Sequence, residues 1–245
     1  MNQYKERQKI VEEIMTTALA KTLDRRYRSY LYTKKFCYLA ISRFFIGEHV
    51  LELGCDESPT TSILVRWSKR LTVVDRVDKL SPKISDDPLL LSLEFIQSNW
   101  EDFYPESRFS DIVLTDGLEH VDEPVQILER MKKFLAPGGR IHVVVPNALS
   151  IHRLLGVNMG LLSSPYALNE NDLYSGHKTV YDVTKLTSDV LKAGIATLTI
   201  EGIQLKPMSD TQLSQFPAEY LEALNQLSYL FPTHCAEIYV CGTHC

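Results

Sequence analysis

The sequence predicts an α/β protein built on one mostly parallel β-sheet with helices on both of its faces. Two observations predict this fold. Short apolar runs typical of buried strands alternate along the chain with stretches in which apolar residues recur at helical spacing. The chain is also long enough, at 245 residues with 44% hydrophobic and 23% charged, to bury a substantial core.

The first 45 residues are expected to form two helices. Apolar residues recur every three or four positions within residues 3–23, and a second helical stretch covers about residues 30–45 and ends at Gly47. We assign residues 1–45 to an N-terminal helical cap. Three of its tyrosines would either close over a site as a lid or simply pack into the core: Tyr27, Tyr30 and Tyr32.

The strands and helices that follow alternate regularly, which indicates parallel strands joined by crossover helices. Five strands are expected at residues 49–54, 70–75, 93–100, 110–117 and 140–147. A helix is expected at residues 62–69. An amphipathic helix begins near Glu123, carries Pro124 in its first turn and is stopped by Pro137-Gly138-Gly139.

The regular alternation breaks after the fifth strand. Residues 147–182 are polar and contain Gly, Pro, Asn and Ser, and long segments of this kind in compact folds tend to be binding loops. A helix at residues 182–195 and two strands at 198–207 and 236–243 then close the domain. We therefore predict one domain over residues 46–245 with an insertion at about 147–182.

Composition excludes several classes of protein. A net charge of −5 and a pI near 5.8 argue against a general nucleic-acid binder. The N-terminus has no apolar signal-peptide core, and no apolar run approaches the ~20 residues that span a bilayer, so we expect a cytoplasmic protein without a membrane span.

The cysteines are odd in number and widely spread, which suits reduced thiols in a cytosol. They are Cys37, Cys55, Cys235, Cys241 and Cys245. The C-terminal stretch HCAEIYVCGTHC contains three of them and two histidines, but its spacings match no common zinc pattern. We therefore predict no metal site.

Polar residues and a glycine follow the ends of the first four predicted strands, where ligands bind in open parallel sheets. Gly54 follows the first strand, and Asp75 ends the second, 21 residues further on, a separation that suits a carboxylate gripping the two ribose hydroxyls of an adenosine. Residues 99–101 and 115–117 would complete the same crevice. Taken singly, such a glycine is more often a turn and such an aspartate a helix cap.

Four segments together resemble the class I S-adenosylmethionine-dependent methyltransferases in order and spacing. They are VLELGC (50–55), LTVVD (71–75), SDIVLTDGLEHVDEP (110–124) and LAPGGRIHVVVPN (135–147). The resemblance covers about residues 45–242. It implies a Rossmann-like sheet of seven strands with an antiparallel last strand, and S-adenosylmethionine as the cofactor.

The resemblance also implies which residues hold this cofactor. Glu52 and Gly54 match the acidic residue and the glycine that face its methionine portion, and Asp75 matches the acid that binds ribose. Residues 99–101 lie where an amide or acidic side chain meets the adenine edge. The cofactor-binding residues implied in this way are Glu52, Gly54, Cys55, Asp56, Asp75, Arg76, Asn99, Trp100, Glu101, Thr115, Asp116 and His120.

The loop after the first strand departs from the family pattern of three alternating glycines, of which only Gly54 is present. Asp56 and Ser58 stand in place of the other two. Asp56 would either accept a hydrogen bond from the ammonium group of the cofactor, worth roughly 1.5–3 kcal/mol, or crowd the site. We expect an intact, altered loop. The G-x-G-x-x-G pattern of nicotinamide dehydrogenases is absent.

The methyl acceptor is expected to bind to the insertion. His177 is the first candidate for a general base and His152 the second, although His177 can equally cap a helix or bond backbone. The candidate substrate-binding residues are Asn147, Arg153, Tyr166, Lys178 and Tyr181.

These features predict an enzyme that transfers a methyl group to an oxygen or nitrogen of a small metabolite, such as a sugar or a natural-product intermediate. Two alternatives stay open: a peptide N-methyltransferase, and a catalytically inactive scaffold protein with a methyltransferase fold. We expect a small-molecule partner and neither nucleic acid nor membrane. The sequence leaves the oligomeric state undecided, with a homodimer among the options.

Overall fold

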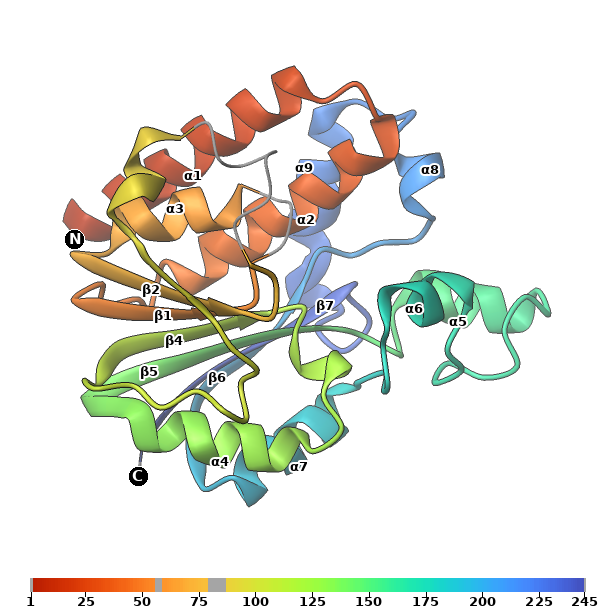
Figure 1. Ribbon diagram of the computed structural model, residues 1–245. Coiled ribbons are helices and arrows are strands. Elements are labelled where there is room, and N and C mark those ends of the chain that lie inside the picture. The colour runs from red at the N-terminus through yellow and green to blue at the C-terminus, as the bar shows by residue number, and fades with distance from the viewer. Residues whose placement is uncertain (1, 56–58, 79–86, 245) are drawn as a thin grey trace.

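Seven strands form one sheet in the order β3-β2-β1-β4-β5-β7-β6 in the computed structural model, which describes residues 2–55, 59–78 and 87–244 (Figure 1). Strands β1 to β5 run parallel to their neighbours among themselves, whereas β7 is antiparallel to both β5 and β6. The predicted fold class is confirmed. The strands are His49–Leu53 (β1), Arg70–Asp75 (β2), Glu94–Gln97 (β3), Phe109–Thr115 (β4), Leu135–Pro146 (β5), Ile195–Ile203 (β6) and Glu237–His244 (β7).

Helices cover both faces of the sheet (Figure 1). One face carries α1 (Asn2–Lys21), α2 (Arg25–Ile41), α3 (Thr60–Trp67) and α9 (Ala218–Gln226), and the other carries α4 (Pro124–Phe134) and α7 (Val183–Lys192). Because side chains alternate across a strand, successive residues of β1 enter different cores. Val50 packs in the cluster that contains α1 to α3, and Leu51 packs in the cluster that contains α4 and α7.

The helix expected to continue to Pro137-Gly138-Gly139 ends earlier, at Phe134. Residues Leu135 to Gly139 belong instead to β5, where Leu135 pairs with Phe109 of β4. The backbones approach closely here, since a Cβ on Gly139 would lie 2.9 Å from the carbonyl oxygen of Ala136 and 3.0 Å from that of Phe109. Glycine permits this contact, so the residues that end the helix also begin the strand.

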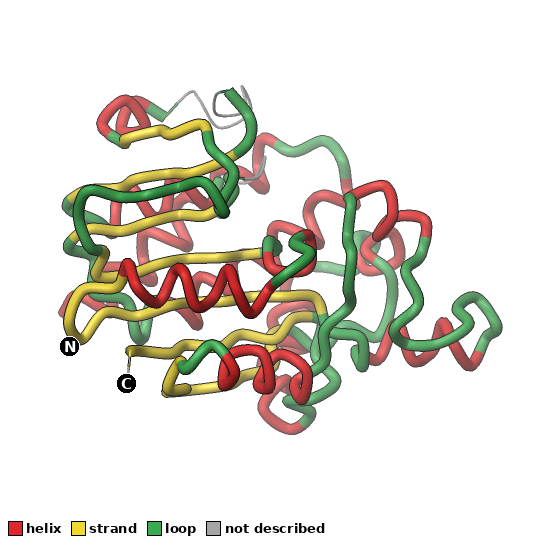
Figure 2. The backbone as a smooth tube through the Cα atoms, turned by 60° about the horizontal axis from the view of Figure 1, so that its bottom comes forward, coloured by secondary structure: helices red, strands yellow, loops and turns green. Residues whose placement is uncertain are grey.

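The segment expected as an irregular insertion contains two short helices, α5 (Ile151–Asn158) and α6 (Glu170–Ser175), which lie beyond the carboxyl ends of the parallel strands (Figures 1 and 2). Asn169 and Asp172 form a reciprocal capping box at the start of α6. The connection between β6 and β7, left unassigned from sequence, contains α8 (Asp210–Leu213), α9 and a 3₁₀ turn, η3 (Leu227–Leu230).

Two further 3₁₀ turns complete the described elements: η1 (Pro88–Ser92), before β3, and η2 (Leu118–His120), after β4. Within the described part of the chain, no helix combines the length and the apolar character that crossing a bilayer requires.

Candidate active site

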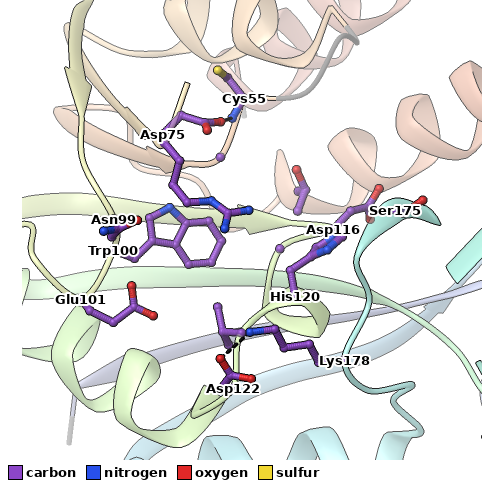
Figure 3. Close-up of a pocket in the computed structure, with 15 residues that line it drawn as sticks. Cys55, Asp75, Asn99, Trp100, Glu101, Asp116, His120, Asp122, Ser175 and Lys178 are labelled. Carbon is purple, nitrogen blue, oxygen red and sulfur yellow. Dashed lines mark hydrogen bonds and ion pairs between the residues drawn. The ribbon is translucent and has the colours of Figure 1, made fainter. Parts of the chain in front are cut away.

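A cavity of about 410 Å³ opens at the carboxyl ends of β1 to β4, next to the point where the strand order reverses between β1 and β4 (Figure 3). Ten of the twelve predicted cofactor residues line it; Glu52 does not, and Asp56 lies outside the described residues. The lining residues are Gly54, Cys55, Asp75, Arg76, Asn99, Trp100, Glu101, Thr115, Asp116, Gly117, His120, Val121, Asp122, Ser175 and Lys178.

The turn after β1 fixes the carboxylate of Asp75. Gly54 has a φ of +80°, a conformation that favours glycine, and its N–H donates to the Val74 carbonyl at 2.9 Å. The next backbone N–H, that of Cys55, donates to Asp75 Oδ2 at 2.7 Å, and the N–H of Val77 donates to Oδ1 at 3.2 Å. Each oxygen keeps a lone pair with which it can accept from a ligand hydroxyl.

Asp56 and Ser58, the residues that replace the family glycines, lie outside the described residues. The expectation of an altered but intact loop therefore stays a prediction. Glu52 lies in the middle of β1, where it is 2% exposed and stands in register between Val73 and Val113. Glu52 is not among the residues that line the cavity.

The indole of Trp100 forms one wall of the cavity. A Cβ on Gly54 would lie 3.3 Å from this ring, and a Cβ on Gly117 would lie 2.6 Å from it. The ring therefore packs against both glycine positions, one after β1 and one after β4. Asn99 beside it donates from its side-chain amide to Asp102 at 2.9 Å.

Asp116, directly after β4, has a φ of 51° although it is not glycine. Its carboxylate pairs with the ammonium of Lys34 on α2, a side chain only 1% exposed. The other Asp116 oxygen, Oδ1, has no hydrogen-bond partner among the described residues. Such strained backbone tends to cluster at functional sites and to be held by its surroundings. Lys34 was missed from sequence because it lies 82 residues from its partner and in a helix whose charges indicate a solvated face.

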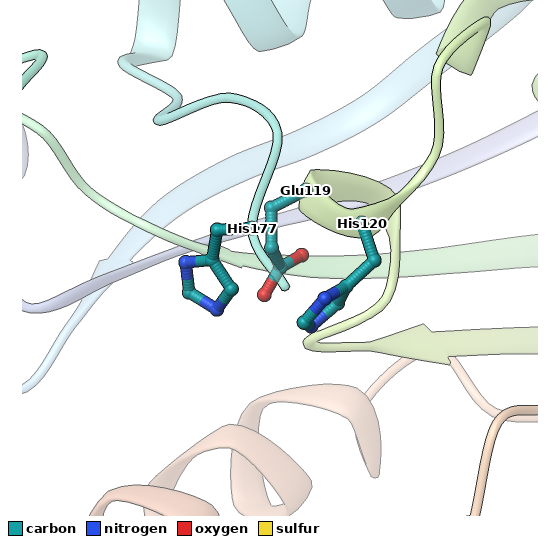
Figure 4. Close-up of side chains that lie close together, drawn as sticks. All are labelled: Glu119, His120 and His177. Atoms are coloured by element: carbon teal, nitrogen blue, oxygen red, sulfur yellow. The ribbon is translucent and has the colours of Figure 1, made fainter. Parts of the chain in front are cut away.

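Two histidines meet beside the cavity. The rings of His120 and His177 lie edge to face with centroids 4.7 Å apart, and the carboxylate of Glu119, the residue before His120 in η2, lies between them (Figure 4). Burial lowers the pKa of both imidazoles and raises the pKa of Glu119 to about 8. The segment after α6 is attached here through the N–H of Lys178, which donates to the Glu119 carbonyl at 2.8 Å.

Lys178 lines the cavity and forms an ion pair with Asp122, and both side chains are exposed. The other basic residue predicted to bind substrate, Arg153, is buried and holds the insertion together. It donates to the Pro165 carbonyl at 2.9 Å and pairs with Asp172 at 3.0 Å.

Three further predicted residues lie away from the cavity lining. The amide of Asn147 is buried and donates to the carbonyls of Thr233, at 3.0 Å, and Cys235, at 2.8 Å. Tyr181 is buried beside it, and burial raises the pKa of its hydroxyl well above the usual range. Tyr166 donates to Asp182 at 2.6 Å.

His152, the second candidate base, also lies outside the cavity lining. Its backbone N–H donates to the carbonyl of Lys206 at 3.2 Å, and burial lowers the pKa of its imidazole to about 4. An imidazole with so low a pKa is neutral at pH 7 but is a weak base. Of the two candidates, only His177 lies beside a residue that lines the cavity, His120.

Comparison with known proteins identifies the family. A family model described as a methyltransferase domain matches residues 23–200, more than half of the chain. The mitochondrial ubiquinone biosynthesis O-methyltransferase of Schizosaccharomyces pombe is 25% identical over 120 residues, which are 47% of this chain and 44% of that protein. The match thus spans less than half the length of this relative.

Solved structures share the fold. An S-adenosylmethionine-dependent methyltransferase from Mesorhizobium loti superposes with a TM-score of 0.59 at 14% identity, over 84% of this chain and 96% of that one. The 1,6-didemethyltoxoflavin-N1-methyltransferase of Burkholderia thailandensis gives a TM-score of 0.57 at 14% identity, over 86% of this chain and 77% of that one. The chain belongs to the S-adenosylmethionine-dependent methyltransferase family, and S-adenosylmethionine is its cofactor.

The cavity fits this cofactor. The carboxylate of Asp75, oriented by two backbone N–H groups, can accept hydrogen bonds from the ribose hydroxyls. The indole of Trp100 offers an apolar surface to the adenine base. Asn99 and Glu101 lie on the same side of the cavity (Figure 3).

Proposed function

We propose that this enzyme methylates an oxygen or nitrogen of a small metabolite, such as a sugar or a natural-product intermediate. One observation carries the proposal: a single cavity of about 410 Å³ is lined both by residues at the strand ends and by polar residues of η2 and the insertion, His120, Ser175 and Lys178. A space of this size suits a cofactor and a small acceptor side by side. The names of the S. pombe and B. thailandensis relatives, an O- and an N-methyltransferase of small molecules, support it.

The bound cofactor supplies a methyl group already activated by a sulfonium. The protein then has to position the acceptor in line with that group and, where the acceptor carries a proton, accept it. Asp75 would hold the ribose, and residues 99–101 would hold the adenine. Thr115 to Gly117 line the same cavity and would face the reacting atoms.

We assign the general base to His177, with His120 orienting its ring through their edge-to-face contact. Because burial lowers the pKa of His177, its imidazole is neutral at pH 7, the form that accepts a proton. Lys178 would orient the acceptor. Arg153 and Tyr166 would act as positioning residues, since their bonds hold the segment that carries His177 and Lys178.

Titration calorimetry with S-adenosylmethionine and S-adenosylhomocysteine tests the cofactor half of the proposal. We expect micromolar binding, about −8 kcal/mol, and at least a tenfold loss in Asp75→Ala. Asp78→Ala removes an exposed carboxylate from the same loop and should bind as the wild type does. A well-folded wild type that binds neither compound would contradict the proposal and favour the inactive scaffold.

Transfer of a labelled methyl group to a panel of hydroxylated and amino-bearing metabolites tests the other half. His177→Ala should lower kcat by 10²–10⁴-fold while S-adenosylhomocysteine binding stays within about threefold. Turnover of peptides but of no small metabolite in the panel would overturn the assignment of the acceptor and support the peptide alternative.

A further inference from the structure

We propose that Glu119, His120 and His177 form a binding site for a divalent transition-metal ion of the zinc type. Each residue offers one ligand atom, and these three atoms lie within 4.8 Å of one another (Figure 4). The site differs from the expectation, drawn from the C-terminal cysteines and histidines, that the chain holds no metal. Sequence spacing could not indicate it, because His177 comes from a different element than the adjacent pair Glu119 and His120.

The state of Glu119 points to a cation. Its side chain is 1% exposed, and neither carboxylate oxygen has a hydrogen-bond partner among the other described residues. A buried carboxylate without partners is costly, and buried charges are normally paired or bound to a metal. Two imidazoles offer nitrogen lone pairs next to this carboxylate, so a metal ion would satisfy all three groups at once.

The backbone holds the two halves of the site together. The N–H groups of Lys178 and Thr179 donate to the carbonyl of Glu119 at 2.8 and 3.3 Å, so the residue before Lys178 is kept beside the η2 turn. This pairing is independent of the side chains that would bind the ion. The carboxylate and His177 are therefore placed side by side before any metal arrives.

An outer carboxylate stands behind His177. Asp172 Oδ1 lies 3.5 Å from Nδ1 of this ring, and the other oxygen of Asp172 pairs with Arg153 at 3.0 Å. Metal-binding histidines almost always have such a partner at the nitrogen that does not bind the metal. Arg153, the nearest fixed positive charge on that side, is thereby neutralised.

The donor set selects the kind of ion. Two imidazoles and one carboxylate suit zinc and its neighbours among the first-row metals, whereas magnesium and calcium prefer oxygen donors alone. Ligand atoms around one zinc lie about 3.3 Å apart for bonds of about 2.0–2.1 Å. The separations therefore have to shorten by up to roughly 1.5 Å, which rotation of the two partly exposed imidazoles can provide. Three protein ligands leave a fourth position open.

The consequence of the site for catalysis rests on the proposed function. His120 lines the cofactor cavity whereas Glu119 and His177 do not, so an ion held by all three would stand at the cavity wall. An ion there would bind an acceptor hydroxyl oxygen and lower its pKa, so that the hydroxyl would release its proton to solvent water before methyl transfer, and His177 would serve as a metal ligand and not as the general base. Metal binding itself needs neither cofactor nor acceptor and can be measured alone.

Calorimetry with Zn²⁺ on the metal-free full-length protein, without cofactor, tests the inference. We expect one ion per chain with micromolar affinity or tighter, and a 10–100-fold loss in each of His177→Ala and Glu119→Gln. His244→Ala removes an exposed histidine elsewhere and should bind as the wild type does. Failure to bind one zinc, or equal zinc affinity in His177→Ala, overturns the proposal.

Substitution with Co²⁺ identifies the ligands by absorption. Imidazole and carboxylate ligands give visible d–d bands without the near-ultraviolet charge-transfer band of cobalt–thiolate bonds, and a thiolate band would overturn the assignment by placing the ion on cysteines. If Glu119→Gln does not fold, the zinc affinity of His177→Asn is compared with that of the wild type instead, because His177 lies on a partly exposed segment. S-adenosylhomocysteine binding of each variant separates a lost metal site from a lost cofactor site.

Discussion

The ammonium group of Lys34 on α2 pairs with the carboxylate of Asp116, the residue that leaves β4 with a positive φ. The N-terminal helices thereby reach the wall of the cavity, since Asp116 lines it and Lys34 is buried behind it. None of the three tyrosines considered as a lid lines the cavity. Tyr32 is buried, and the ring of Tyr27 stacks on that of Tyr30. The centroid of the Tyr30 ring lies 5.0 Å from the ammonium nitrogen of Lys34.

Removal of this ammonium should destabilise the protein. We expect Lys34→Met to lower the free energy of unfolding by roughly 2–4 kcal/mol, because it leaves a partly buried carboxylate unpaired. Asp116 is 25% exposed, so the loss falls short of that of a fully buried pair. Urea denaturation measures it. Lys69→Met, whose pair with Glu48 is exposed on both sides, should change stability by less than about 1 kcal/mol. Equal stability of both variants would contradict the role given to Lys34.

A methyl group at Gly117 should weaken cofactor binding. The added Cβ would lie 2.6 Å from the ring of Trp100, which must then shift from the cavity wall. We expect Gly117→Ala to raise the dissociation constant of S-adenosylhomocysteine about tenfold or more. Calorimetry measures this constant, and Trp100 fluorescence in a Trp67→Phe background follows the ring, since these are the two tryptophans of the chain.

The control for this substitution is Gly156→Ala on α5. A Cβ there meets only side-chain atoms of Leu162 at 3.4 Å and beyond, an ordinary contact, and alanine favours a helix. Its affinity for S-adenosylhomocysteine should stay within about twofold of the wild type. An unchanged affinity in Gly117→Ala would mean that Trp100 does not set the shape of the cofactor cavity.

Stability should depend on pH through the buried pair His142 and Asp111. Burial, the largest single influence, lowers the pKa of His142, but the hydrogen bond to Asp111 at 3.2 Å, the charge of Asp111 and the interaction with Cys241 together outweigh it and raise the pKa to about 9. Burial likewise opposes the ionised form of Asp111, yet His142 and the N–H groups of Gly47 and Ile46 hold its pKa below the usual value.

The pH dependence of the free energy of unfolding follows from the raised pKa of His142 and the lowered pKa of Asp111. The contribution of His142 is complete below its unfolded pKa of about 6.5 and is lost as pH rises through about 9, on the order of 3 kcal/mol. The contribution of Asp111 is present above about pH 4 and is lost in acid. Urea denaturation from pH 3 to 10 should therefore show a maximum at about pH 4–6.5, and His142→Gln should flatten the alkaline side of the curve. If His142→Gln leaves the alkaline side of the curve unchanged, His142 is not the group responsible for the loss of stability there.

Arg153 should control the order of the insertion. Arg153→Ala removes the bonds to the Pro165 and Ala167 carbonyls and the ion pair with Asp172. We expect faster hydrogen exchange over residues 159–176, read by mass spectrometry, with little change in the sheet. Arg70→Ala, whose pair with Glu94 is exposed, should leave exchange in that segment unchanged. Normal exchange in Arg153→Ala would favour a direct role in substrate binding.

The sheet was predictable because each of its strands is a local signal. β1, β2 and β4 are apolar runs that end at a turn, and the glycine or carboxylate at each end marks the crevice. The predicted end of α4 was wrong for an equally local reason. Leu135 and Ala136 continue the helical pattern up to the predicted stop at Pro137-Gly138-Gly139, and nothing nearby in sequence shows that Leu135 pairs with Phe109 on the adjacent strand β4.

The acceptor side was harder to predict because its residues come together only in three dimensions. His177 joins Glu119 through backbone bonds made after α6, an element that has no strong apolar periodicity. Asn147 and Arg153 have the polarity of ligand-binding residues, yet both bond extensively to backbone carbonyls. Polarity alone does not distinguish a side chain that binds a ligand from one that stabilises a loop.

The insertion leaves and rejoins the sheet at nearly the same point. Asn147 and Tyr181 form an isolated parallel bridge, and the N–H of Ala148 donates to the Tyr181 carbonyl at 2.6 Å. Both ends of the segment 149–180 are therefore anchored at the same place on the sheet. On the function proposed above, we expect that exchange of this segment for that of another enzyme with the same fold changes the acceptor while β1, β2 and their carboxyl-end turns stay as they are. Substitutions in the insertion and substitutions at the strand ends would then alter acceptor binding and cofactor binding separately, in evolution and in protein engineering.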